Sequence, residues 1–373
     1  MSNEFIVKGI TKAKLPSDYG STGFKMFKGS ILNSVEVAYE TWGKLSVNND
    51  NVILLFTGLS PSSHAASSDK NNEKGWWEFM IGPNKPIDTK KYYVVCVNSL
   101  GSCFGSTSPA SVNKETGDVY GLNFPELSIE DIAKAGHSVL QTLGIDYAHT
   151  VMGPSMGGMT ALAYALLYPN SLSNLVVISA AARALPFTIS IRSLQRELIR
   201  SDPLWNEGIY DKETAPLNGM KLARKLGLMS YRAANEWRQR FNRARLPKSE
   251  NKKMFDIEFE VENYLNHNSK KFVSMFDPNC YLYLSRAMDL FDVAEHGGTV
   301  NAGLAKIHTK KNLIIGVESD ILFPIDQQEE LAEGFKKAKK NFKFEKLKSI
   351  QGHDSFLVDE KNFSKVIYNF FND

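Results

Sequence analysis

The stretch His149-Thr-Val-Met-Gly-Pro-Ser-Met-Gly157 decides the fold. Residues 149–152 predict a short strand, and the apolar run from Met156 to about Tyr168, ended by a proline, predicts a helix. Between them lies Gly-x-Ser-x-Gly, in which Ser155 occupies a strained strand-to-helix turn that lifts its hydroxyl above the sheet. A glycine-rich turn with an incidental serine is the alternative, but the strand and helix on either side favour a nucleophile.

Outside this stretch, strands and helices alternate. Near-continuous apolar runs are typical of strands buried on both faces of a parallel sheet. A Ser-x-x-Asp start and a terminal glycine bound a predicted helix at 128–144, and a second helix is predicted at 327–340. This order favours an α/β fold with a mostly parallel sheet covered on both sides. The predicted strands, besides 149–152, are 35–42, 51–58, 92–98, 175–179, 312–317 and 342–350.

The pattern changes near residue 185. From there to residue 299 the chain is polar, rich in Arg, Trp and Tyr, and without buried-strand runs. Apolar positions recur at helical spacing in 188–200 and 219–229. The sequence therefore predicts a helical lid at 185–299, inserted into an α/β core made of residues 1–184 and 300–373.

Composition excludes several classes of protein. The 373 residues carry 44 Lys and Arg against 41 Asp and Glu, a net charge of +3 that gives no reason to expect nucleic acid or an anionic membrane as partner. Three cysteines imply no disulfide framework and fit a reducing compartment. The N-terminus lacks the pattern of a signal peptide, and no apolar run approaches the ~18 residues of a membrane helix. A cytoplasmic location is expected.

A nucleophilic serine needs a base and an acid that orients the base. In the α/β-hydrolase arrangement both follow the serine, at later strand ends. The predicted strand 312–317 leads to Glu318 and Asp320, and the last predicted strand leads to His353. Asp320 is the better orienter because its loop can turn inward. The prediction is a triad of Ser155, Asp320 and His353; His64 is the other histidine placed to border the same cleft.

Acyl transfer also needs two donors for the developing oxyanion. The backbone N–H of Met156 is one candidate, and that of Leu59, in the loop after strand 51–58, is the other. A plain turn before Pro61 explains that loop equally well. No Cys-x-x-Cys, His-x-x-x-His or His-Glu-x-x-His occurs, and Gly101-Ser-Cys-Phe-Gly-Ser106 completes neither a dinucleotide fingerprint nor a P-loop. No metal and no bound cofactor are expected.

Short motifs are spread over most of the chain: Gly75-Trp-Trp-Glu, Gly82-Pro, Ile87-Asp-Thr, Cys96-Val-Asn-Ser-Leu-Gly, Gly105-Ser-Thr, Gly153-Pro-Ser-Met-Gly-Gly-Met and Gly352-His-Asp. Taken together, these motifs resemble the homoserine O-acyltransferase family of α/β-hydrolase-fold enzymes, over about residues 35–371. Within that family the chain is more similar to the serine O-succinyltransferase branch, through residues 57–61, 184–197 and 276–289. The homoserine branch usually reads Gly-Asp-Ser/Ala-His after its second strand, where this chain has Gly58-Leu-Ser-Pro-Ser-Ser-His64.

The resemblance implies a CoA-dependent O-acyltransferase that works through a ping-pong acyl-serine mechanism, with succinyl-CoA or acetyl-CoA as co-substrate. It implies that Arg224 binds the substrate, that Asp354 contacts the acceptor, and that Arg192 lies where the acyl-CoA is chosen. The residues associated with acceptor choice are Gly58, Leu59, Ser60 and Pro61. A homodimer through the lid helices is also implied.

Three functions remain open. The first is transfer of a succinyl group from succinyl-CoA to L-serine, for cysteine biosynthesis. The second is a homoserine O-acetyltransferase, for methionine biosynthesis, and the more distant third is an esterase. An arginine suits a substrate carboxylate and an acid suits an ammonium group, so Arg224 and Asp354 favour an amino acid over a neutral ester. A succinyl group ends in a carboxylate, which Arg192 would favour.

Overall fold

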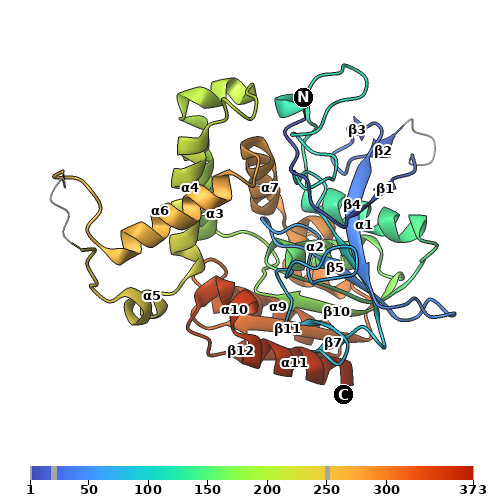
Figure 1. The fold of residues 1–373 in the computed structure, drawn as a ribbon. Coiled ribbons are helices and arrows are strands. Elements are labelled where there is room, and N and C mark those ends of the chain that lie inside the picture. Colours follow the sequence, from blue (N-terminus) through green and yellow to red (C-terminus); the bar gives the residue numbers. More distant parts are fainter. Residues whose placement is uncertain (1, 18–22, 248–252, 373) are drawn as a thin grey trace.

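The computed structural model describes residues 2–17, 23–247 and 253–372. Its centre is a sheet with the strand order β1-β4-β8-β5-β9-β10-β11-β12 (Figure 1). The first two pairs are antiparallel and the remaining pairs are parallel. The bounds are β1 Thr11–Lys14, β4 Glu36–Trp42, β5 Val52–Phe56, β8 Tyr93–Val97, β9 Ala148–Pro154, β10 Leu172–Ile178, β11 Lys311–Val317 and β12 Phe342–Leu347.

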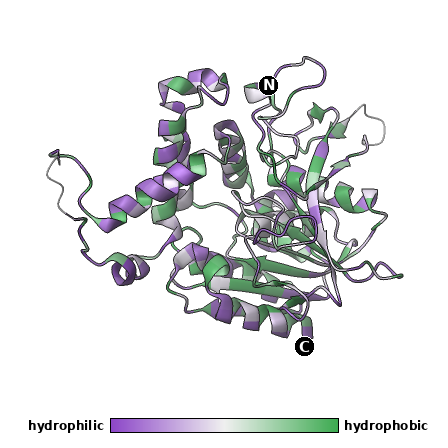
Figure 2. Cartoon of the chain, viewed as in Figure 1, coloured by the Kyte–Doolittle hydropathy of each residue, from purple (hydrophilic) through white to green (hydrophobic). Residues whose placement is uncertain are grey.

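Each central strand buries both of its faces, as its apolar run predicts. Val151 and Met152 of β9 are neighbours that point to opposite sides, and each side has its own apolar cluster. One cluster includes α1 (Ile129–Thr142), α2 (Met156–Leu167) and α9 (Ile325–Lys337), and the other includes α11 (Glu360–Asn372). In Figure 2 the strands are mostly in the hydrophobic colour. The predicted α/β-hydrolase architecture, a mostly parallel sheet between helices, is confirmed.

The predicted lid, residues 185–299, lies between β10 and β11. Helix α3 packs against both α4 and α7, and α4 also packs against α6. These helices stand beside the sheet in Figure 1. Residues 248–252 of this segment lie outside the described residues. The helices of the lid are α3 Pro186–Arg200, α4 Leu217–Tyr231, α5 Ala234–Phe241, α6 Glu260–Val273 and α7 Pro278–Leu290; the short α8, Val300–Ala305, follows in the core.

Several short elements have no clear sequence signal. Edge strand β1 reads Thr-Lys-Ala-Lys and buries only its alanine, so it has no apolar run. The two-residue pairs β2–β3 and β6–β7 and the single turn α10 (Ser355–Val358) are too short for any periodicity. The pairs are Phe24–Lys25 with Ile31–Leu32 and Ile81–Gly82 with Ile87–Asp88. In the described part of the chain, no helix has the length and apolar character to span a bilayer.

Candidate active site

Ser155 occupies the turn between β9 and α2 in the strained conformation that its motif predicts. Its backbone angles, φ 56° and ψ −124°, are rarely adopted by residues other than glycine. Its N–H donates to the carbonyl of Ile178 at 2.8 Å. The flanking glycines are sterically required: a Cβ on Gly153 would overlap the backbone of Gly157, and one on Gly157 would overlap the carbonyl of Phe56. The turn therefore holds the serine side chain out at the sheet edge.

This crowding makes the elbow sensitive to a single methyl group. Gly157→Ala is expected to lower the free energy of unfolding by about 1–3 kcal/mol, because the added Cβ must displace strand β5 or the turn itself. Urea unfolding followed by tryptophan fluorescence measures this. Gly58→Ala is the matched control, since a Cβ there would meet nothing closer than 3.7 Å. Equal unfolding midpoints for the two variants would contradict the steric argument.

The structure brings Ser155, Asp320 and His353 together. Ser155 follows β9, Asp320 follows β11 and His353 follows β12, and these parallel strands end at the same edge of the sheet. His353 Nε2 lies 2.8 Å from Ser155 Oγ, and His353 Nδ1 lies 2.7 Å from Asp320 Oδ2. All three residues are buried. The arrangement allows an imidazole to take the serine proton while a carboxylate fixes its tautomer.

Asp320, and not Glu318, faces the histidine. Its Oδ1 accepts from the N–H groups of Leu322 and Phe323, both at 2.8 Å, which leaves Oδ2 for His353. Glu318 is exposed. The ring of Phe323 stacks on the imidazole with 5.1 Å between centroids. His353 is therefore held both by its hydrogen bond to Asp320 and by packing against this ring.

A cavity of about 120 Å³ borders Ser155. The core contributes Ser155, His353 and the loop 58–61, and the lid contributes side chains of α3, α4 and α7. The loop is close to the nucleophile, since a Cβ on Gly58 would lie 4.0 Å from that of Ser155. Met156 is buried at the first position of α2. The predicted residues that line the cavity are Gly58, Leu59, Ser60, Pro61, Ser155, Arg192, Arg224, His353 and Asp354.

Two arginines of the lid reach this cavity, Arg192, which is buried, and Arg224, which is half-buried. Arg192 is 3% exposed, and its Nη1 and Nη2 have no hydrogen-bond partner among the described residues. The Nε and Nη1 of Arg224 likewise have none there, while its guanidinium lies 4.1 Å from the ring centroid of Phe272. A buried guanidinium nitrogen without a partner is costly, so both side chains are suited to an anionic ligand.

Asp354 also lines the cavity, but its carboxylate already faces a cation. Its Oδ2 lies 3.0 Å from Nε of Arg232, which also approaches Glu236 at 3.4 Å. Burial raises the pKa of Asp354, and the charge of Arg232 opposes that rise. Sequence reasoning missed Arg232, and likewise the cavity residues Gln195, Tyr231 and Tyr281. In sequence they look like other members of a polar, Arg- and Tyr-rich lid.

His64 does not line the cavity, contrary to its expected place at the cleft. Its Nδ1 lies 2.9 Å from Oε2 of Glu40 on β4, and its Nε2 lies 2.9 Å from the carbonyl oxygen of Glu73. The side chain therefore links its own loop to strand β4 and to the segment around Glu73. The three cysteines are buried and free. Within residues 2–17, 23–247 and 253–372, no group of three or more His, Cys, Asp or Glu side chains could hold a metal ion.

The fold and this site define an α/β hydrolase, and a family model described as alpha/beta hydrolase fold matches residues 51–360. Among sequence relatives, the serine O-succinyltransferase of Litchfieldella anticariensis is 52% identical over 348 residues, which is 93% of this chain and 95% of the relative. The serine O-succinyltransferase of Stenotrophomonas maltophilia is 52% identical over 369 residues, which is 98% of each chain. The chain therefore belongs to the serine O-succinyltransferase family within this fold and is an acyltransferase, as its motifs predict.

Solved structures of the same fold include enzymes of two kinds. Homoserine O-acetyltransferase from Bacillus anthracis superposes with a TM-score of 0.88 at 28% identity, covering 98% of each chain. Esterase E22 superposes with a TM-score of 0.87 at 28% identity, covering 98% of this chain and all of that one. The fold thus carries both transferases and hydrolases, and the substrate has to be argued from the site.

Proposed function

We propose that this protein transfers the succinyl group of succinyl-CoA to the hydroxyl of L-serine, with Ser155, His353 and Asp320 as the catalytic triad. One observation carries the proposal: two arginines, Arg192 and Arg224, line the cavity beside Ser155 with buried guanidinium nitrogens that lack hydrogen-bond partners in the described chain. The two substrates of this reaction bring two carboxylates, one on the succinyl group and one on the amino acid. Each arginine can bind one of them.

In the first half-reaction His353 accepts the proton of Ser155 through Nε2, and Oγ attacks the thioester carbonyl. The negative charge that develops on the carbonyl oxygen is stabilised by the N–H groups of Met156 and Leu59. When the C–S bond breaks, the imidazolium gives its proton to the CoA sulfur. CoA leaves as a thiol, and the succinyl group stays on Ser155 as an ester.

In the second half-reaction L-serine occupies the cavity. His353 takes the proton of the acceptor hydroxyl, whose oxygen attacks the ester carbonyl. The C–O bond to Ser155 breaks, and the same imidazolium returns a proton to Oγ. O-succinylserine leaves, and the enzyme is restored. Because water could replace the acceptor, the lid serves to hold serine near the ester and to keep water out.

Different residues recognise L-serine, the acyl acceptor, and succinyl-CoA, the acyl donor. Arg224 binds the α-carboxylate of the acceptor, Asp354 attracts its ammonium group, and the loop 58–61 limits the length of its side chain. Arg192 binds the distal carboxylate of the succinyl group, which an acetyl group lacks. An esterase acting on a neutral substrate would leave the terminal nitrogens of Arg192 and the Nε and Nη1 of Arg224 without an acceptor.

The test is the release of CoA thiol from succinyl-CoA and from acetyl-CoA, each with L-serine and with L-homoserine. We expect the fastest turnover with succinyl-CoA and serine, and little release when no acceptor is present. Equal turnover with homoserine would refute the serine assignment. Equal thiol release with and without an acceptor would instead indicate a hydrolase.

The wider setting of this activity follows from its product. O-succinylserine is an activated serine whose side chain can be displaced by a sulfur nucleophile, which suits cysteine biosynthesis in the cytoplasm. The protein acts as a homodimer through its lid helices, with small molecules and neither nucleic acid nor membrane as its other partners. Exposed apolar side chains on α3 and α4 support such a contact; they are Phe187, Leu194, Leu217, Leu222 and Met229.

A further inference from the structure

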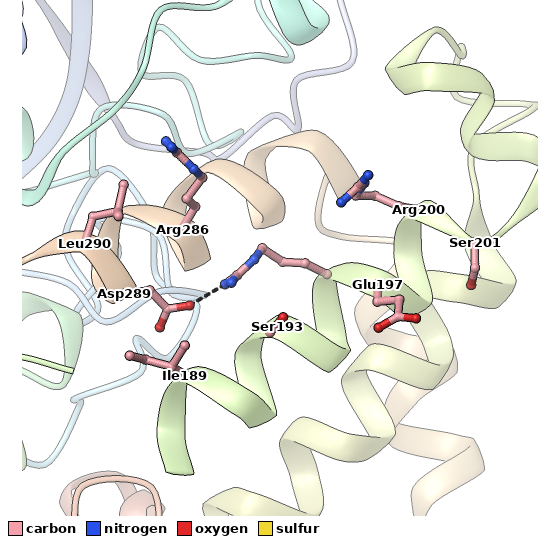
Figure 3. Close-up of a pocket in the computed structure, with 9 residues that line it drawn as sticks. Ile189, Ser193, Glu197, Arg200, Ser201, Arg286, Asp289 and Leu290 are labelled. Atoms are coloured by element: carbon pink, nitrogen blue, oxygen red, sulfur yellow. Dashed lines mark ion pairs between the residues drawn. The ribbon is translucent and has the colours of Figure 1, made fainter. Parts of the chain in front are cut away.

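Asp289, near the C-terminal end of α7, joins two arginines of α3. Its Oδ1 lies 2.5 Å from Nε of Arg192, and its Oδ2 lies 2.7 Å from Nη1 of Arg196. The carboxylate is almost fully buried, with 7% of the side chain exposed. Figure 3 shows Asp289 directed from α7 toward α3; the dashed line marks its ion pair with Arg196, and Arg192 is not drawn. A buried carboxylate therefore connects the helix that carries Arg192 to its neighbour.

This contact determines what Arg192 presents to the cavity. A guanidinium is planar and rigid, so a bond at Nε fixes where Nη1 and Nη2 lie. The ring of Phe323 lies 5.9 Å from Cζ of Arg192 and limits movement to that side. Because Nη1 and Nη2 have no partner in the described residues, Arg192 keeps two parallel donors for a ligand.

Arg196 interacts with the second carboxylate oxygen of Asp289. An aspartate that faces one arginine alone commonly binds it through both oxygens, which would occupy Nε and one Nη of Arg192. Here Nη1 of Arg196, which donates to Ser285 Oγ at 2.9 Å, forms an ion pair with the second oxygen of Asp289 at 2.7 Å, and that oxygen accepts no hydrogen bond among the described residues. Asp289 consequently holds Arg192 through Nε alone and leaves its terminal nitrogens available.

We propose that Asp289 is a positioning residue for donor choice, which aims the terminal nitrogens of Arg192 at the carboxylate of the succinyl group. The inference rests on the proposed function and deepens it. Asp289 acts through Arg192 and touches no reacting atom. Its effect is therefore on the preference for succinyl-CoA over acetyl-CoA, and not on the chemistry at Ser155.

The test is Asp289→Asn, which keeps the shape of the side chain and removes its charge. We expect kcat/KM for succinyl-CoA to fall roughly tenfold or more, the size expected for weakening one charge-assisted hydrogen bond. For acetyl-CoA, which has no distal carboxylate, kcat/KM should fall less than about threefold. Glu197→Gln is the matched control. This exposed acid lies on α3 and, like Asp289, lines a surface groove between α3 and α7, and its substitution should leave the ratio unchanged.

Equal losses with both donors, or no loss with either, would overturn the proposal, since a purely structural ion pair affects both donors alike. If the unmodified enzyme shows no preference for succinyl-CoA, the proposed function fails first, so the two failures are distinguishable. Should Asp289→Asn give no folded enzyme, Asp289→Glu keeps the charge and moves it by one methylene. A fall in its succinyl-to-acetyl ratio supports the proposal, and an unchanged ratio overturns it.

Discussion

Replacement of Ser155 by alanine is expected to lower turnover with succinyl-CoA and serine by at least about 10⁴-fold, because the variant lacks the oxygen that carries the acyl group. His353 Nε2 lies 2.8 Å from that oxygen. Intact-mass spectrometry after mixing with succinyl-CoA, without acceptor, should show one added succinyl group on the unmodified protein and none on Ser155→Ala.

The control for this experiment is Ser179→Ala. Ser179 is also buried and directly follows β10, the strand next to β9, but it is not part of the triad. Its alanine variant should keep the succinyl adduct. An adduct that persists in Ser155→Ala would remove this serine from the mechanism and leave the pocket arginines without a neighbouring nucleophile.

The three candidate catalytic residues could be predicted because each is marked either by a local sequence motif or by its position after a predicted strand. The turn around Ser155 requires glycines, and the five-residue motif Gly-x-Ser-x-Gly contains them. The buried strands appear in the sequence as apolar runs. Once the sheet is taken as parallel, residues that follow strands 312–317 and 342–350 must lie at the edge where Ser155 lies. Asp320 and His353 were found in this way, with no knowledge of their contacts.

The lid contacts could not be predicted in the same way. Asp289 and Arg192 are 97 positions apart, and their pairing depends on how α7 packs against α3. Arg232 is one of many lid arginines, and nothing in its local sequence indicates that it faces Asp354. Sequence reasoning placed Asp354 beside His353 but left its ion-pair partner unknown, because that partner comes from the turn between α4 and α5, which the core sequence does not specify.

The second large effect is expected for Asp320→Asn, through the tautomer of His353. In the unmodified protein Oδ1 of Asp320 accepts two backbone N–H groups, and Oδ2 faces Nδ1 of the imidazole. An asparagine must direct its carbonyl oxygen to those two donors, which places its amide NH₂ against Nδ1. The ring nitrogen must then accept, so the proton moves to Nε2.

With its proton on Nε2, His353 donates to Ser155 Oγ and cannot take the serine proton. We therefore expect kcat to fall by about 10⁴-fold while the fold is kept, which the burst of CoA release in rapid-mixing experiments would measure. Asp326→Asn, at an exposed acid in the first turn of α9, serves as the control and should leave the burst unchanged. A loss of less than about tenfold would mean that Nδ1 does not depend on this carboxylate for its proton, and Asp320 would then be a structural support for its own loop.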